Sequence, residues 1–473
     1  MALALHGRPE NPVLTVHEGL RYEVVVENSG PAALELPVVE DESGRLAVVL
    51  ETADGRRRVM SGLTGQALTS SARLDTEPVL DTLAPGGRWQ ATLDLAAWHL
   101  PLPAGRHRVR ATYEHEPAGV ALATEAAEIE VRDVPLVRVT VARDRALLDS
   151  LVALLEARGP EGPEFYLRQL NAPRPLAAWC STRVLAGEPA DEAFVSTSAF
   201  DAAETFDPCF ERWVVWRAGA TLGARLHALG APEGETLRAA LPPGRAVVPS
   251  AVHGADGALR VFLAAPGLLE CHRFGARGLE RVFERALPGF EAARAVVRAD
   301  GQALHVLWAG REVRYARLDA DGGVRDRRSL RAGRLPAHAF DFEPRSGLLR
   351  ASFLDAPHGS TVTLAALNVD TDDAWRLELD RVLLRGGVRE LAFDVSVRGT
   401  FHVLVAPARG GLYYLRGGSP SRRVAAGPGP FHPHVVAHRR VYLGFARPGL
   451  GHRHLQIAGR RARRWLADPE TLA

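Results

Sequence analysis

The sequence of 473 residues predicts an all-β fold in three consecutive parts. We expect a β-sandwich over residues 1–135, a short helical connector over 136–207 and a six-bladed β-propeller over 208–473, with room for a seventh blade. Three observations support this. Short apolar runs alternate with turn residues in the first part, one amphipathic run marks the second, and a repeat recurs through the third.

The N-terminal part consists of short predicted strands with no helix-period stretch between them. Residues 22–28 and 127–132 are apolar or alternating runs, and turn pairs such as Asp54-Gly55 separate such runs. So many strands in one domain-sized stretch predict a β-sandwich. Residues 83–87, followed by 102–113, resemble immunoglobulin-like modules of bacterial proteins, in which a proline-glycine turn precedes a late strand. The resemblance implies a fold and no catalytic residue.

The second part has the spacing of an amphipathic helix. Within residues 143–158, leucines recur three or four positions apart, and Gly159-Pro160 ends the run. A weaker helical run covers 164–170. We expect these segments to link the two β-domains or to pack between them.

A repeat from about residue 208 is the strongest pattern in the chain. Six segments share a small or polar step and then an apolar strand, and their ends lie 47, 45, 45, 52 and 40 residues apart. The segments are Arg212–Trp216, Gly257–Leu263, Gly301–Trp308, Gly347–Phe353, Gly399–Val405 and Arg440–Phe445. A second strand, a hairpin turn and an outer strand follow each one. About four strands in ~40–50 residues is typical of a propeller blade.

One repeat resembles a known family. Residues 300–308, followed by 313–319, are similar to the generic repeat of bacterial sialidase-type propellers. The resemblance covers residues 208–466 and implies the propeller fold. The Ser-x-Asp-x-Gly-x-x-Trp box that many of those proteins carry is missing here, so the resemblance implies no catalytic activity.

Composition excludes several classes of enzyme. All 58 cationic residues are arginine, because the sequence contains no lysine. Phosphate-binding loops of the Walker type, protein kinases and Schiff-base enzymes all need a lysine. No G-x-S-x-G elbow occurs, and no dinucleotide motif stands in a strand-turn-helix setting. We therefore expect no cofactor.

The inner strands of the propeller are the best predicted place for a site. Their polar residues are expected to converge on the central channel; they are His253, Arg298, Asp341, Glu343 and Asp394. The three carboxylates could supply the proton donor and the nucleophile or base of a glycoside hydrolase. The alternative, which we favour, is that inner-strand polar groups bond to neighbouring blades and to channel water.

Histidines gather near the C-terminus. His432, His434 and His438 are weak candidates for metal ligands, since imidazole binds transition metals and alternate residues share one face of a strand. No acidic partner lies nearby in sequence. A hydrated surface is the favoured interpretation, and we expect no metal.

Charge is distributed unevenly along the chain. Residues 1–135 contain 12 arginines and 20 acidic residues, whereas residues from Ser421 to the end contain 10 arginines and 2 acidic residues. The arginines of the last blade are candidates for contact with an anionic partner; they are Arg439, Arg440, Arg460, Arg461, Arg463 and Arg464. Nucleic acid is the less favoured partner. Docking onto the acidic N-terminal sandwich, or onto an acidic partner, is the favoured one.

The function predicted from these patterns is non-enzymatic. We expect a scaffold that binds a protein, a glycan or an anionic polymer through the propeller rim. A propeller glycoside hydrolase and a nucleic-acid or acidic-partner binder are the alternatives. No segment approaches the ~18 apolar residues of a membrane span, and the N-terminus lacks the basic region of a signal peptide. We therefore expect a cytoplasmic protein with no membrane partner.

Overall fold

The computed structural model describes residues 3–466 with gaps. The gaps are 38–45, 53–54, 61–79, 96–101, 144–150, 171–178, 197, 200–210, 229–233, 235, 254–257, 276, 300–302, 310–311, 333–341, 346–347, 355–361, 369–373, 379–386, 397–398, 418, 420, 438–440, 448, 450 and 459–461. Strands dominate the described residues, and the 3₁₀ turns with both ends described are η2 (Glu116–Ala118) and η3 (Ala292–Arg294). None of their helices is long and apolar enough to cross a bilayer.

Two sheets face each other in the N-terminal part. One contains β1 (Leu3–Pro9), β3 (Arg21–Asn28) and β8 (Arg88–Asp94). The other contains β2 (Val13–Thr15), β11 (Ala127–Arg132), β9 (Gly105–His115), β5 (Leu46–Glu51) and β6 (Arg57–Met60), with β10 (Val120–Ala123) paired to β9. A further pair joins β4 (Leu34–Pro37) and β7 (Leu80–Leu83).

The period of two along these strands places one face in a shared core. On β3, Tyr22, Val24 and Val26 are buried and alternate with partly exposed residues. They belong to one apolar cluster with Val48 of β5 and Val109 of β9. Because both sheets contribute to this cluster, the N-terminal part is a β-sandwich.

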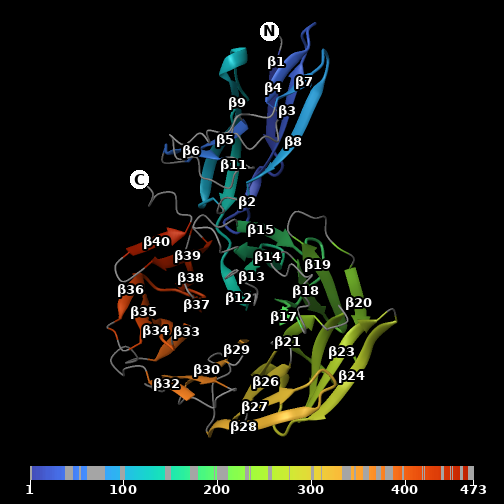
Figure 1. Ribbon diagram of the computed structural model, residues 1–473, viewed down its shortest axis with the longest axis vertical. Helices are drawn as coiled ribbons and strands as arrows, with labels where there is room; N and C mark the ends of the chain where they lie inside the picture. The colour runs from blue at the N-terminus through green and yellow to red at the C-terminus, as the bar shows by residue number, and fades with distance from the viewer. Residues whose placement is uncertain are drawn as a thin grey trace.

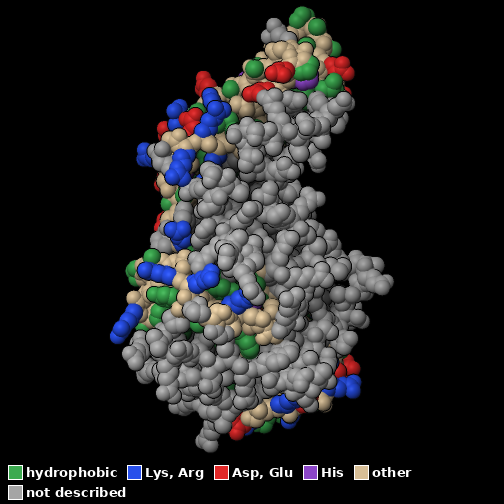
Figure 2. Space-filling model, turned by 60° about the vertical axis from the view of Figure 1, so that its left-hand side comes forward, with side chains coloured by type: hydrophobic (Ala, Val, Ile, Leu, Met, Phe, Trp, Pro, Cys, Tyr) green, Lys and Arg blue, Asp and Glu red, His purple; other side chains and the backbone are tan. Residues whose placement is uncertain are grey.

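Opposite charges pair across the outer faces of the sandwich. Arg88 reaches Glu27 at 3.1 Å between neighbouring strands, and Arg132 reaches Glu130 at 3.0 Å along β11. Figure 2 shows basic and acidic side chains intermixed on the visible face of the sandwich. Such exposed pairs contribute little to stability, at most about 1 kcal/mol each.

Seven sheets follow the sandwich in chain order. Sheet 1 contains β12 (Leu136–Arg143), β13 (Leu151–Arg158), β14 (Pro163–Leu170) and β15 (Trp179–Val184). Sheet 2 contains β16 (Glu192–Val195), β18 (Glu211–Ala218), β19 (Thr221–Ala228) and β20 (Thr236–Ala240). Sheet 3 contains β17 (Ser198–Ala199), β21 (Ala246–His253), β22 (Leu259–Ala265), β23 (Leu268–Gly275) and β24 (Gly278–Ala286).

The remaining four sheets repeat the same order. Sheet 4 contains β25 (Ala295–Ala299), β26 (Leu304–Ala309), β27 (Glu312–Leu318) and β28 (Val324–Ala332). Sheet 5 contains β29 (Phe342–Arg345), β30 (Leu348–Leu354), β31 (Val362–Asn368) and β32 (Ala374–Glu378). Sheet 6 contains β33 (Val388–Val395), β34 (Phe401–Pro407), β35 (Leu412–Arg416) and β36 (Arg422–Ala425). Sheet 7 contains β37 (His434–Ala437), β38 (Val441–Arg447), β39 (Gly451–Ala458) and β40 (Ala462–Leu466).

These sheets form a ring, with the sandwich attached beside sheets 1 and 7 (Figure 1). Neighbouring strands within each sheet are antiparallel, except that β17 runs parallel to β21. Apolar clusters of described residues lie between several pairs of successive sheets. One of them joins Phe262 and Phe283 of sheet 3 to Val306 and Trp308 of sheet 4.

The predicted helical connector is wrong. Residues 151–158 form β13, which pairs along its whole length with β14, the strand that replaces the second predicted helix. The leucine spacing wrongly indicates a helix because β13 is buried on both faces. Leu154 packs in a cluster with Trp216, and Leu155 packs in a separate cluster with Tyr166. An apolar run buried on two faces does not distinguish a strand from a buried helix.

Candidate functional site

Strands β21, β25 and β33 of the ring place three of the predicted site residues in buried positions. His253 ends β21, Arg298 lies on β25 and Asp394 lies on β33, with 8%, 7% and 0% of their surfaces exposed. Buried polar groups of this kind need hydrogen-bond partners. Their partners indicate what each residue does.

Asp394 joins sheet 6 to sheet 7. Its Oδ2 atom accepts the backbone N–H of Ala437 in β37 at 2.6 Å, and its Oδ1 atom accepts the N–H of Val395 at 2.5 Å. Hydrogen bonds from backbone amides to a carboxylate are stronger than those between neutral groups. The carboxylate therefore stabilises the boundary between the two sheets.

Arg298 and His253 also connect neighbouring elements. Arg298 Nη1 donates to Ser250 Oγ of sheet 3 at 3.3 Å, and Ser250 Oγ also accepts the N–H of Val297 at 3.1 Å. His253 Nε2 lies 3.3 Å from Oγ of Ser196, which follows β16 of sheet 2. Each contact connects a predicted site residue to the adjacent sheet.

The side chains of the other two predicted channel carboxylates lie outside the described part of the structure. Asp341 lies outside the described residues. Glu343 lies on β29, and its side chain is outside the described part. The convergence of the channel residues on one site stays a prediction.

His432 adopts a backbone conformation that is uncommon for a residue with a side chain. Its φ is 44°, in the left-handed region. Both oxygens of Glu390 hold this turn, accepting the N–H groups of Phe431 and His432 at 2.8 Å each. The Nε2 atom of His432 lies 3.2 Å from the carbonyl oxygen of Leu136, so its ring reaches from the start of sheet 7 to sheet 1. Burial lowers the pKa of His432.

The histidines do not form a metal centre among the described residues. The His434 ring stacks on the His452 ring, with centroids 4.7 Å apart and planes 18° apart. His438 lies outside the described residues. In the described ranges, no group of three or more histidine, cysteine or acidic side chains has a geometry that could hold a metal ion.

The arginines predicted to meet an anionic partner are only partly placed. Arg463 and Arg464 lie on β40, and their side chains are outside the described part. The other four lie outside the described residues: Arg439, Arg440, Arg460 and Arg461. Their role stays a prediction.

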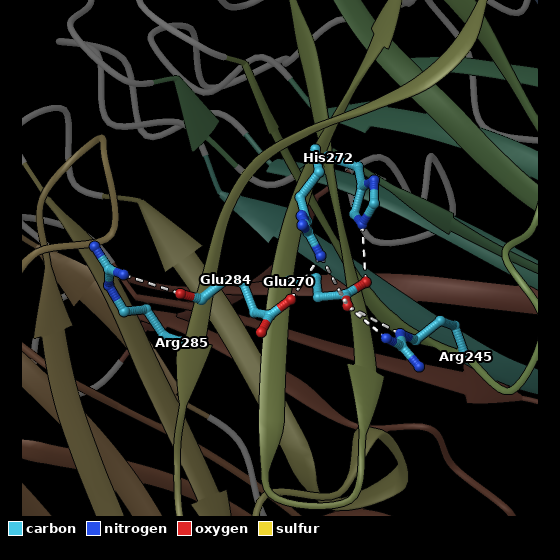
Figure 3. Close-up of polar contacts among 6 residues, drawn as sticks. Arg245, Glu270, His272, Glu284 and Arg285 are labelled. Atoms are coloured by element: carbon cyan, nitrogen blue, oxygen red, sulfur yellow. Dashed lines mark hydrogen bonds and ion pairs between the residues drawn. The ribbon is translucent and has the colours of Figure 1, made fainter.

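A charged cluster in sheet 3 was missed by sequence reasoning (Figure 3). Glu270 of β23 is 2% exposed, and its Oε1 atom accepts hydrogen bonds from Nε and Nη2 of Arg245 at 3.0 and 2.8 Å. Its Oε2 atom lies 3.0 Å from Nε2 of His272. The hydrogen bonds from Arg245 hold the pKa of Glu270 below its usual value, against the effect of burial.

The same cluster continues onto β24. Arg281 Nη1 lies 2.6 Å from Glu284 Oε2 and 3.9 Å from Glu270 Oε1. Arg285 donates to the carbonyl oxygens of Asp321 and Gly322, which belong to a hairpin of sheet 4. Chemically, the cluster provides a buried, ionised carboxylate whose two oxygens already have partners. Glu270 and His272 are two positions apart on one strand, so the sequence could have indicated that their side chains share a face. No sequence pattern indicated that Arg245 would join them.

The chain is similar to several solved β-propeller structures, at low sequence identity. No protein-family model matches the chain, and no curated protein matches it. Solved structures do. The β-propeller domain of the trilobed protease from Pyrococcus furiosus is 9% identical over 71% of this chain and 99% of that chain, with a TM-score of 0.41.

Two further solved structures show the same level of likeness. Hsv2 from Kluyveromyces marxianus is 10% identical over 70% of this chain and 97% of that one, with a TM-score of 0.41. A subtype N10 neuraminidase-like protein of A/little yellow-shouldered bat/Guatemala/060/2010 is 12% identical over 61% of this chain and 96% of that one, with a TM-score of 0.36. At such identities and TM-scores the likeness indicates nothing about function, and the ring is described from its own sheets.

Proposed function

We propose that this protein is a non-enzymatic binding scaffold. In this proposal the seven sheets are the blades of a propeller whose rim binds a protein or polymer partner. The N-terminal sandwich, as an immunoglobulin-like module, holds that rim in a set orientation. The observation that carries the proposal is the junction between sandwich and ring, which involves both the first and the last sheet.

The junction is built from buried and hydrogen-bonded groups. His17 of the sandwich is 1% exposed, and its ring centroid lies 5.1 Å from that of Tyr166 in sheet 1. On the other side, the backbone N–H of Ala104 donates to the carbonyl oxygen of Gly449, next to sheet 7, at 2.8 Å. The N–H of Gly449 in turn donates to Asp133 Oδ2 at 2.9 Å. A sandwich held at two places is suited to positioning a binding surface.

The junction predicts one relative orientation of sandwich and ring in solution. Fluorescent labels on the turn at Gly86 of the sandwich and on the hairpin at Gly322 of sheet 4 should give a single narrow distribution of transfer efficiencies. A broad distribution, typical of a freely tethered domain, would contradict the positioning role.

A glycoside hydrolase is the alternative in which channel carboxylates perform chemistry. The bonds of Asp394 to two backbone N–H groups favour the binding proposal, since this carboxylate already has structural partners. We expect no hydrolysis across a panel of chromogenic glycosides. Hydrolysis that is lost in the Asp341→Asn variant would contradict the binding scaffold and support the glycoside hydrolase.

Binding of nucleic acid through the last sheet is the third candidate. Guanidinium groups bind phosphate oxygens, and such binding weakens steeply as salt concentration rises. Replacement of the arginines between positions 460 and 464 should then weaken binding to a duplex DNA probe. A flat salt response, or no effect of the replacement, would exclude this candidate.

A further inference from the structure

The sequence contains a long stretch without acidic residues. Residues 395–467 include 13 arginines and no aspartate or glutamate over 73 positions. This stretch supplies β34, β35 and β36 of sheet 6 and all of sheet 7. Outside β33, which carries Glu390 and Asp394, the strands of sheets 6 and 7 therefore contribute no acidic side chains to balance their cations.

Three described arginines on this side make none of the ion pairs that other arginines of the ring make. Arg416, Arg422 and Arg423 are exposed, and in the described structure no carboxylate lies within ion-pair distance of them. By contrast, Arg281 of sheet 3 lies 2.6 Å from Glu284, and Arg325 of sheet 4 lies 3.4 Å from Asp319. In Figure 2 this side of the ring comes forward, and its described middle part shows Arg side chains, whereas Asp and Glu side chains lie among Arg side chains on the sandwich and at the lower edge of the ring.

Two of these arginines lie on an open sheet edge. Strand β36 ends the order β33-β34-β35-β36, and no described strand pairs with its outer side. Arg422 lies opposite Tyr414 and Arg423 lies opposite Tyr413. Tyr414 packs in the cluster shared with sheet 7, and Tyr413 packs against a different cluster on the other face. Arg422 and Arg423 therefore project from opposite faces of the sheet and flank its edge.

The surroundings of Tyr414 independently indicate a concentration of positive charge. Arg416 and Arg422 both act electrostatically on the Tyr414 hydroxyl, although its burial dominates and raises its pKa to about 12. Arg416 also acts on His402, where burial and then this positive charge lower the pKa to about 4. The cations thus cluster around the end of β35 and the start of β36.

We propose that the outer edge of β36 binds an extended acidic peptide segment of a partner protein by strand addition. An added strand pairs its backbone with the open edge, and its side chains alternate between the two faces of the sheet. Neighbouring carboxylates on that strand would meet Arg422 on one face and Arg423 on the other. Nucleic acid could satisfy the arginines but has no row of amide groups for the sheet edge.

A labelled oligo-glutamate of about ten residues, long enough to cover a typical strand, is the probe. Its fluorescence anisotropy with the full chain should report binding at about 50 mM salt and weaker binding as salt screens the charges. The double variant Arg422→Glu/Arg423→Glu should weaken binding at least about tenfold, because two charge-assisted contacts become repulsive. The matched control is Arg325→Glu/Arg327→Glu on β28, another outer strand, which should bind as the unchanged protein does.

Two further probes separate strand addition from charge attraction alone. Oligo-glutamate methylated on every backbone nitrogen keeps its carboxylates but cannot donate to the edge, so it should bind at least about tenfold more weakly. The proposal would be overturned if the methylated probe bound as tightly as the unmethylated one, or if both double variants weakened binding equally. Preferential binding of single-stranded DNA over oligo-glutamate would also overturn it. Self-association in light scattering that disappears in Arg422→Glu/Arg423→Glu would also overturn it, assigning the edge to a second copy of the chain. The surface lies apart from the inner strands, so none of these outcomes decides the proposed function.

Discussion

Two buried histidine–tyrosine pairs occupy equivalent places in the ring. His305 Nδ1 lies 2.8 Å from the Tyr315 hydroxyl in sheet 4, and His402 Nδ1 lies 2.7 Å from the Tyr414 hydroxyl in sheet 6. In both sheets the histidine is on the second strand and the tyrosine on the third, with the rings stacked. The repeat therefore places the same hydrogen-bonded pair in two blade interiors, where polar groups need partners.

The His402 pair predicts loss of stability in mild acid. Burial lowers the pKa of His402 from 6.5 to about 4, so between these pH values the unfolded chain takes up a proton that the folded chain does not. The free energy of unfolding should fall by about 3 kcal/mol from this group as pH drops from neutral to 4. Urea titrations should show a smaller fall for His402→Gln, and His6→Gln, at an exposed position, should leave the fall unchanged. An unaltered pH dependence in His402→Gln would contradict this assignment.

The Glu270 carboxylate predicts a large cost for its loss. Glu270→Gln removes the ionic acceptor of Arg245 and of His272 in a nearly buried site, so the free energy of unfolding should fall by about 2–3 kcal/mol. Glu280→Gln is the control, because its pair with Arg273 has 46% and 49% of the side-chain surfaces exposed and should matter by less than about 1 kcal/mol. The lowered pKa of Glu270 means that its contribution is present above pH 4.5 and is lost as pH falls below that value. Equal effects of the two substitutions would contradict this difference.

At the scale of elements, Gly444 allows β38 to pass close beneath a histidine. A Cβ atom at this position would overlap the ring of His434, which stacks on His452. Gly444→Ala should lower the free energy of unfolding by about 1–3 kcal/mol through overpacking. In a His434→Ala background, which opens that space, the same substitution should cost clearly less. An equal cost in both backgrounds would show that the ring is not the obstacle.

Strand β13 shows which elements could be predicted from the sequence and which could not. The alternating pattern of β3 predicts a strand directly, since one face is buried and the other is exposed. On β13, Val152, Ala153, Leu154 and Leu155 are all buried, and the period of two disappears. The hydrophobic pattern then does not show which side chains share a face. The conformation of β13 is decided by its pairing with the neighbouring strands β12 and β14.

At the scale of the whole molecule, the sandwich bridges the first and last sheets of the ring. His17→Ala should loosen this junction, because it removes a ring packed on Tyr166 and a hydrogen bond to the carbonyl oxygen of Val134 at 2.7 Å. Hydrogen exchange should then increase in β12 and around Gly449. Thr124→Ala, which removes a partner of the buried Tyr22 hydroxyl within the sandwich, should leave exchange at the junction unchanged. Faster exchange confined to the sandwich in His17→Ala would contradict the bridging role.

Part of the candidate site can be predicted from the sequence, and part of it is visible only in the structure. The inner strands and their polar residues follow from the repeat, because position within a blade is set by distance along the chain. The partners of those residues do not follow from it. Asp394 meets Ala437, 43 positions away, and His432 meets Leu136, 296 positions away. Such contacts depend on how the ring closes.

By itself the sequence determined the β-rich character, the repeat period, the absence of lysine chemistry and the uneven distribution of arginine. These properties depend only on which side chains occur and at what spacing. The tertiary structure alone decided that strands β12 to β15 form a sheet of the ring, that Arg245 reaches Glu270 and that Arg422 and Arg423 flank an open edge. Each of these is a relation between segments far apart in the chain, and packing between sheets creates it.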